Sequence, residues 1–384
     1  MRIFWPRRGD RTPRRALLRV AVSLRACSLL LFAISSSYAQ ALLYIGGWPK
    51  QILVIDEAQQ KVVDHIQLET GTPRHIEISY DRKKLFATTW EHSGVEVIDL
   101  ATRKVVNHFL LNEGNRKVHF FGFTSDPQDK LLYATINAAV KQVDRFEIEP
   151  TKFAVIDLAQ QKITKTVDYP KEEEGIFGRF AGLRVSPDGK HLYQFRENVL
   201  IFDTTDFKLE EKIELAKPQF PGIERVGVWA NNDPADDPGI MHTTFNATDP
   251  VVHRETFGIA RVDLAHRNFD FTPIGPATFG MMGLAVTPDH KTGYTVAFIH
   301  DNPGNRRCEF WVFDLVARRL VKKVEFPART RFDFAISSTG KQLYIFTAGP
   351  TLEIFDADTL QPQKTIELQA DVTTDLIVVP AKKP

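Results

Sequence analysis

The residues of this chain that could do chemistry are basic side chains placed just before or within short apolar segments. Arginine offers paired N–H donors that match a carboxylate or phosphate, and histidine exchanges protons near neutral pH. The candidate ligand-binding residues are Arg74, His75, Lys117, His119, Arg179, Arg225 and Arg331. They predict a pocket for a small anionic ligand. The alternative is that they bond to loop carbonyls or to acidic residues such as Glu77 and Asp333.

Neither catalytic residues nor a metal site is predicted. No carboxylate, histidine and nucleophile stand at a recognisable catalytic spacing. Asp233, Asp236, Asp237 and His242 crowd one segment, but the calcium-binding EF-hand pattern is absent, so this segment is predicted to be a long turn. The chain has two cysteines and no Cys-x-x-Cys-His haem motif, and we expect no cofactor.

The elements that must position the basic residues come from a repeat. A tetrapeptide close to Val-Ile-Asp-Leu recurs with its aspartate at Asp56, Asp99, Asp157, Asp203, Asp263, Asp314 and Asp356. A period of about 40–50 residues with β-rich units is typical of a propeller. Seven repeats therefore predict an all-β, seven-bladed β-propeller, and we interpret the aspartates as turn residues.

One repeat shows the expected blade. Its four strands are predicted at His75–Ser79, Lys84–Trp90, Val95–Leu100 and Lys104–Leu111, from β-branched and aromatic runs bounded by turn formers. The first strand of each blade lines the central channel of a propeller. The basic residues lie where these first strands begin, and we expect them to converge on one mouth of the channel.

The two chain ends are predicted to share a blade. The segments Ala41–Ile45, Gln51–Asp56 and Lys61–Leu68 supply three strands without a preceding first strand. The missing strand is predicted at Asp375–Pro380, near the C-terminus. This pairing closes the ring and removes an exposed sheet edge.

The long connections are expected on one side of the ring, which we call the loop-rich face. They link the second strand to the third within a blade, or one blade to the next. These segments are Asn137–Lys152, Phe245–Gly258, Asp168–Gly182, Ala216–Arg225 and Thr272–Gly283. Loops that lengthen on one face of a rigid scaffold are the expected place for a binding site.

The first 39 residues have the features of an export signal. Residues 1–25 contain eight arginines and one aspartate, Ala26–Ile34 is apolar, and Ser37-Tyr38-Ala39 is a cleavage site that leaves Gln40 first. We expect a signal peptide at 1–39, a single propeller domain at 40–384, and a periplasmic or secreted protein without a membrane span. Both the general secretion and twin-arginine routes are open, as is tethering by an uncleaved signal.

The charge of the remaining chain disfavours one class of partner. Without the leader, acidic residues outnumber basic ones by six. A mildly acidic body lacks the general attraction that nucleic-acid binding requires. Nucleic acid is therefore an unlikely partner on the basis of charge.

Two of the repeat units carry a family resemblance. Ser186-Pro-Asp-Gly-Lys-His-Leu-Tyr193 and Val97-Ile-Asp-Leu-Ala-Thr-Arg-Lys-Val-Val106 resemble the YVTN β-propeller repeats of exported bacterial proteins. The Gly-His and Trp-Asp marks of WD40 repeats are absent. The stretches 132–137, 149–156 and 341–368 are similar to the β-chain of quinohaemoprotein amine dehydrogenases. This resemblance implies a periplasmic seven-bladed propeller that docks quinone- and haem-bearing chains and has no redox centre of its own.

The function predicted from the sequence is that of an exported, non-catalytic binding or accessory module. Its loop-rich face would bind a protein partner, such as a quinoprotein or cytochrome-type dehydrogenase, or a small anionic ligand. The alternative is a lactonase-like hydrolase that uses the basic residues at the channel mouth.

Overall fold

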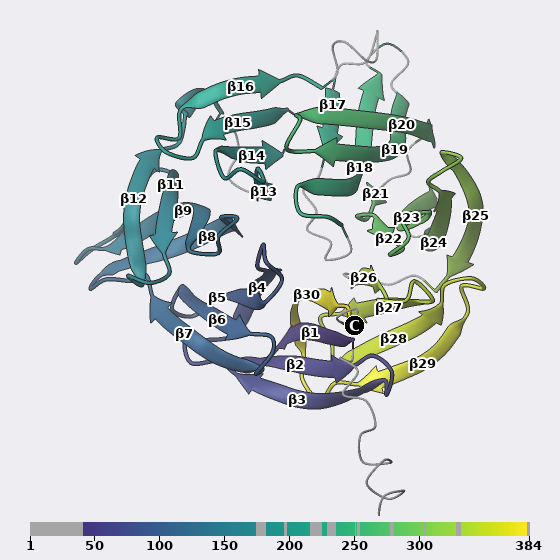
Figure 1. Ribbon diagram of the computed structural model, residues 1–384, viewed down its shortest axis with the longest axis horizontal. Helices are drawn as coiled ribbons and strands as arrows, with labels where there is room; N and C mark the ends of the chain where they lie inside the picture. The colour runs from purple at the N-terminus through teal and green to yellow at the C-terminus, as the bar shows by residue number, and fades with distance from the viewer. Residues whose placement is uncertain are drawn as a thin grey trace, which may run out of the picture. The chain divides into compact units, whose positions relative to one another are not determined.

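A computed structural model of the chain describes residues 41–173, 182–195, 198–215, 225–228, 236–249, 251, 254–276, 280–302, 305–327 and 332–381. They belong to one unit, Ala41–Ala381, which is almost entirely β-structure. In this part of the chain, seven antiparallel sheets follow one another around a ring (Figure 1). The predicted seven-bladed propeller is confirmed.

Each blade is built from an innermost strand beside the channel to an outermost strand at the rim. The first contains, from the inside outward, β30 (Val372–Val379), β1 (Leu42–Gly47), β2 (Gln51–Asp56) and β3 (Lys61–Gln67). The second contains β4 (Pro73–Ile78), β5 (Lys84–Thr89), β6 (Gly94–Asp99) and β7 (Lys104–Leu110). The third contains β8 (Arg116–Ser125), β9 (Leu131–Lys141), β11 (Lys152–Asp157) and β12 (Lys162–Asp168), with β10 (Phe146–Ile148) beside β9.

The remaining four blades follow the same order. The fourth contains β13 (Gly182–Val185), β14 (His191–Phe195), β15 (Val199–Asp203) and β16 (Leu209–Ile213). The fifth contains β17 (Arg225–Val228), β18 (Ile240–Asp249), β19 (Arg254–Asp263) and β20 (Asn268–Pro276). The sixth contains β21 (Gly280–Met281), β22 (Ala285–Val286), β23 (Thr292–Asn302), β24 (Asn305–Asp314) and β25 (Arg319–Phe326). The seventh contains β26 (Phe332–Ile336), β27 (Gln342–Thr347), β28 (Thr351–Asp356) and β29 (Pro362–Glu367).

The recurrent aspartate has the turn role predicted for it. Each of the seven accepts a hydrogen bond from a backbone N–H two or three residues later, as Asp99 does from Thr102 at 2.7 Å. The residue four positions after each aspartate has a positive φ, between 51° and 62°. In every blade, the aspartate carboxylate thus caps the backbone amides of the turn between the third and fourth strands and stabilises that hairpin.

The ring closes as the sequence predicts. β30 pairs antiparallel with β1, from Leu42 opposite Val379 to Gly47 opposite Val372. The strand begins three residues earlier than predicted, and it buries Leu376 in a cluster between the first and seventh blades. Closure leaves the inner edge of β1 paired rather than open.

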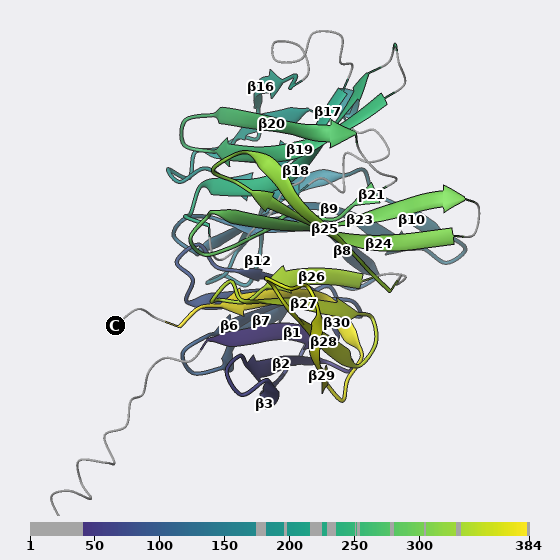
Figure 2. The same ribbon diagram turned by 90° about the vertical axis from the view of Figure 1, so that its right-hand side faces the viewer.

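Three segments predicted as loops are largely strand, and that part of the prediction was wrong. β9 continues to Lys141 and turns back as β10, while β18 and β19 stay paired out to Asp249 opposite Arg254. β20 likewise runs on through Pro276. When the strands stay paired, their backbone N–H and C=O groups hydrogen-bond to each other. In an irregular loop these groups would have to bond to water. The β9–β10 and β23–β24 hairpins project on the same side of the ring (Figure 2).

The other two predicted long connections lie largely outside the described residues. Within Asp168–Gly182, the structure describes a short 3-10 helix, η1 (Lys171–Glu173). Within Ala216–Arg225, it describes only the first residue of β17. No helix in the described ranges is both long and apolar enough to cross a bilayer.

The core lies between the blades. Apolar side chains from adjoining sheets form buried clusters, such as the one that joins Phe153 and Phe202. Cys308 is fully buried on β24, the third strand of its blade. Because both faces of each sheet are covered in this way, the inner strands are held firmly around the channel.

Candidate functional site in the central channel

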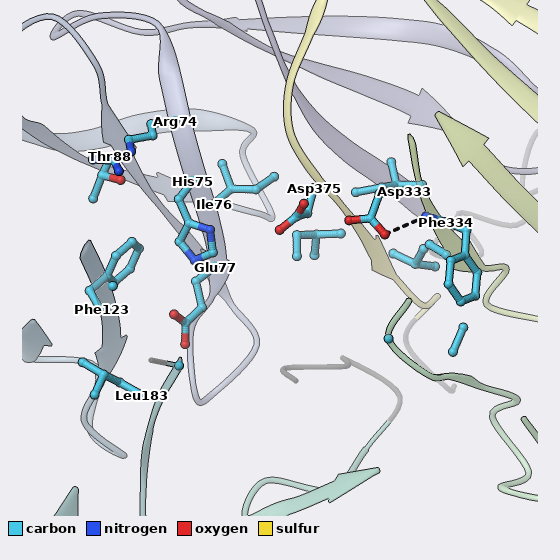
Figure 3. Close-up of a pocket in the computed structure, with 18 of the residues that line it drawn as sticks. Arg74, His75, Ile76, Glu77, Thr88, Phe123, Leu183, Asp333, Phe334 and Asp375 are labelled. Carbon is cyan, nitrogen blue, oxygen red and sulfur yellow. Dashed lines mark hydrogen bonds between the residues drawn. The ribbon is translucent and has the colours of Figure 1, made fainter. Parts of the chain in front are cut away.

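The candidate site is a cavity of about 580 Å³ in the centre of the ring (Figure 3). The inner strands β4, β8, β13, β26 and β30 supply most of its lining. Charged and apolar side chains both line it, and its size is that of a small-molecule site. Its charged lining residues are Arg74, His75, Glu77, Arg184, Asp333 and Asp375.

Three of the inner strands are irregular next to this cavity. The pairing register shifts between Pro73 and His75 on β4, and between Phe120 and Gly122 on β8. On β30, the residues between Val372 and Leu376 bulge opposite a single residue of β1. A bulge re-aims the side chains at its extra positions, and bulges concentrate beside functional sites. Arg74, Phe121 and Asp375 are the side chains so placed.

The acidic part of the cavity consists of Asp333 and Asp375. They extend from β26 and β30, which are neighbouring inner strands, and lie close together in Figure 3. Burial and the charge of Asp375 raise the pKa of Asp333 to about 7, although the backbone N–H of Phe334 donates to its carboxylate at 2.8 Å. Two close carboxyls resist simultaneous ionisation, so this pair retains a proton close to neutral pH.

The basic part consists of Arg74 and His75 on β4. Nη1 of Arg74 donates to the carbonyl of Phe120 at 2.7 Å and lies 3.2 Å from Nε2 of His119. The guanidinium also lies over the indole of Trp90, 4.6 Å from the ring centroid. Burial lowers the pKa of Arg74 but leaves the guanidinium charged at neutral pH.

His75 lies beside the acidic pair in the lining. Its ring packs edge-on against Phe123, with centroids 5.2 Å apart. Burial lowers the pKa of His75, and the negative charge of Asp375 opposes that change. The imidazole therefore favours its neutral form, in which one ring nitrogen donates and the other accepts.

Glu77 and Arg184 line this cavity and also a second one of about 30 Å³. The hydroxyl of Thr124 donates to Glu77 at 3.1 Å. Burial lowers the pKa of Arg184, and the charge of Glu77 opposes this. The Nε atom of Arg184 is buried and has no hydrogen-bond partner within the described part of the chain. The two opposite charges compensate one another at this end of the cavity.

The basic residues predicted from the sequence have different positions. Arg74 and His75 line the cavity. His119 is exposed on β8 and contacts Arg74 from outside the lining, whereas Lys117 is exposed and away from the cavity. Arg179 and Arg331 lie outside the described residues, as does the side chain of Arg225.

Sequence reasoning missed Asp375 and Arg184 and gave Glu77 and Asp333 only the role of ion-pair partners. The available signal was a charged residue inside an otherwise apolar innermost strand. Asp333 lies between Phe332 and Phe334, and Arg184 between Leu183 and Val185. A charged residue in such a strand lies beside the channel, because the innermost strand of a blade borders it.

The Asp236 segment forms a separate polar cluster. Asp236 is only 4% exposed, and its carboxylate lies 2.7 Å from Nδ1 of His242 and 3.5 Å from Nε2 of His290. It also accepts the backbone N–H of His242 at 2.9 Å. Across the described residues, no His, Cys, Asp and Glu side chains form a group of three or more arranged to hold a metal ion.

No family model matches the chain, and no curated protein matches it. Solved structures do match. A functionally unknown protein from Desulfotomaculum acetoxidans has a TM-score of 0.54 at 13% identity, over 90% of this chain and 100% of its own. A Bacteroides fragilis protein, provisionally named a 6-phosphogluconolactonase, has a TM-score of 0.52 at 13% identity, over 90% and 99%. The dihydro-heme d1 dehydrogenase NirN, in complex with DHE, has a TM-score of 0.50 at 11% identity, over 89% and 76%. At these identities the chain shares the propeller fold with them, and the fold alone.

Proposed function

We propose that this chain is an exported, non-catalytic binding module that takes a small ligand into the central cavity. The observation that carries the proposal is a ligand-sized cavity in which Arg74, His75, Asp333 and Asp375 lie together. Among the described lining residues there is no serine or cysteine to act as a nucleophile. A cavity with a few polar groups among apolar side chains is the usual form of a small-molecule site.

Thermal shift of the purified protein against a small-molecule library tests this proposal. A true channel ligand raises the melting temperature of the wild type and loses that effect in Arg74→Gln. Lys117→Gln is the matched control, because it removes an exposed positive charge that does not line the cavity. The proposal fails if no compound stabilises the protein, or if every shift survives Arg74→Gln.

The accessory role rests on the resemblance to YVTN-repeat and quinohaemoprotein amine dehydrogenase β-chain proteins. In this role the mature chain, starting at Gln40, binds a quinone- or haem-bearing protein in the periplasm through its loop-rich face. The test is affinity purification from the native host, followed by mass spectrometry and a visible absorption spectrum. A co-purifying redox polypeptide supports the role. A colourless preparation containing the chain alone argues against it.

The acidic pair favours a second candidate, a lactonase-like hydrolase. The Asp333–Asp375 pair, which retains a proton close to neutral pH, and His75 beside Asp375 would supply an acid and a base to a bound lactone and water. Titration of the acid released from a lactone panel tests this candidate. Turnover that Asp333→Asn and Asp375→Asn both abolish would replace the non-catalytic proposal. Absence of turnover leaves binding as the function.

A further inference from the structure

Three neighbouring inner strands bring opposite charges together at the central cavity. β30 packs against β26 on one side and β4 on the other. Asp333, Asp375 and the Arg74–His75 pair therefore follow one another around the channel, in the order β26, β30, β4 (Figure 3). The acidic groups lie at one end of this series and the arginine at the other.

The groups at both ends have unused hydrogen-bonding capacity. Within the described part of the chain, the Asp375 carboxyl interacts with Asp333 and accepts no hydrogen bond from a backbone N–H or a basic side chain. The Nη1 atom of Arg74 is engaged, whereas its Nε and Nη2 have no partner among the described residues. Arg74 is half-buried and Asp375 is exposed at the cavity, so each can bind a ligand group of opposite charge without first breaking a contact within the protein.

Apolar side chains also line the cavity. Ile76, Leu284, Phe334, Phe346 and Leu376 all contribute to it. Glu77 and Arg184 also line the cavity, and their opposite charges attract one another. A ligand is therefore recognised by charged groups at its ends and by hydrocarbon in its body.

We propose that the cavity binds a small zwitterion, an amino-carboxylate whose ammonium group contacts Asp375 and Asp333 and whose carboxylate contacts Arg74. This inference rests on the proposed small-ligand function and specifies the class of ligand. A purely anionic ligand would place its charge near two carboxyls, and a purely cationic one would leave the free donors of Arg74 unpaired. A molecule with both charges satisfies both ends.

Calorimetry with three probes of the same length tests the ligand class. 6-Aminohexanoate carries both charges, hexylamine only the positive one and hexanoate only the negative one. We expect the wild type to bind the amino acid at least about tenfold more tightly than either single-charge probe. Because the distance between the two contacts sets the optimum, the series from glycine to 8-aminooctanoate should have one preferred chain length.

Two variants assign the contacts. In Asp375→Asn, 6-aminohexanoate should bind no more tightly than hexanoate. In Arg74→Gln, it should bind no more tightly than hexylamine. Asp371→Asn and Lys117→Gln make the same charge changes at exposed positions outside the cavity and should change neither ratio. The comparison of the three probes on the wild type decides the ligand class by itself. The test therefore remains valid even if a variant fails to fold.

Three outcomes overturn the zwitterion. Hexanoate that binds as tightly as the amino acid identifies an anion site, and hexylamine that does so identifies a cation site. Failure of every amino-carboxylate in the series to bind excludes the class. In each case the proposed binding function stands if another compound gives a shift that Arg74→Gln abolishes, so the two failures are distinguishable.

Discussion

The hydroxyl of Tyr344 donates a hydrogen bond to Glu57 at 2.9 Å, although 287 residues separate them. Glu57 follows β2 in the first blade, and Tyr344 lies on β27 in the seventh. The same carboxylate accepts the backbone N–H of Ser338 at 2.8 Å and the Ser338 hydroxyl. Burial and the charge of Glu57 raise the pKa of Tyr344. One side chain thus joins the two blades that close the ring.

A double-mutant cycle on this contact should reveal coupling between Glu57 and Tyr344. Glu57→Gln removes the charge of the acceptor and Tyr344→Phe removes the donor of this buried hydrogen bond, and we expect a coupling energy of about 1–3 kcal/mol. Urea unfolding of the wild type, both single variants and the double variant measures it. Glu255→Gln, at an exposed position on β19, is the control and should change stability by less than about 0.5 kcal/mol. Purely additive effects would show that the contact does not secure the closure.

Removal of the last twelve residues should open the ring. The deletion of 373–384 removes most of β30, including buried Leu376 and Ile377, and exposes the edge of β1. We expect a melting temperature lower by more than about 10 °C, with association on gel filtration. The matched control removes only residues 382–384, which follow the described unit. An unchanged melting temperature in the longer deletion would contradict closure through β30.

Asp333→Asn should stabilise the protein at alkaline pH. Burial and Asp375 raise the pKa of Asp333 from 3.8 to about 7, so the folded state binds a proton there that the unfolded chain has released. Stability from this group is complete below pH 4 and is lost as the pH rises toward 7. At pH 8 the variant should therefore be more stable by on the order of 2 kcal/mol, with the difference vanishing near pH 4.

The measurement is denaturant unfolding at several pH values between 4 and 8. Asp371→Asn, at an exposed position directly before β30, is the control and should parallel the wild type. A variant that is destabilised equally at every pH would show that the carboxyl of Asp333 contributes packing or hydrogen bonding without the expected proton.

Cys308 should be unreactive in the native protein. Its side chain is fully buried within a cluster that contains Phe310 and Phe326, so a disulfide reagent reaches it only after local or global opening. Treatment with a chromogenic disulfide should release no thiol signal from the folded mature chain. One equivalent per chain should appear in guanidinium chloride if the leader, with Cys27, has been removed. Two equivalents would indicate an intact leader.

The predictions from sequence succeeded where the physics is local. The strands were predicted from β-branched and aromatic runs within one repeat. The turn role was predicted for an aspartate that caps its own turn, and it recurs at Asp99 as at Asp356. Seven such units cannot bury their faces alone, so their number also determined the ring and its closure. Arg74 and His75 line the cavity from the start of a first strand, whereas Lys117, chosen for the same position, does not; their ligand-binding role stays a prediction.

The charge pattern of the site was decided by tertiary structure. Asp333 and Asp375 come from different repeats and meet because β26 and β30 are neighbours around the axis. Bulges that no local motif marks re-aim Arg74 and Asp375 toward the cavity. The same bulges and the lengthened hairpins arise from pairing between strands, which depends on the whole blade. The repeat in the sequence therefore determined the propeller scaffold. The packing of neighbouring blades around the axis determined which charged side chains share the cavity.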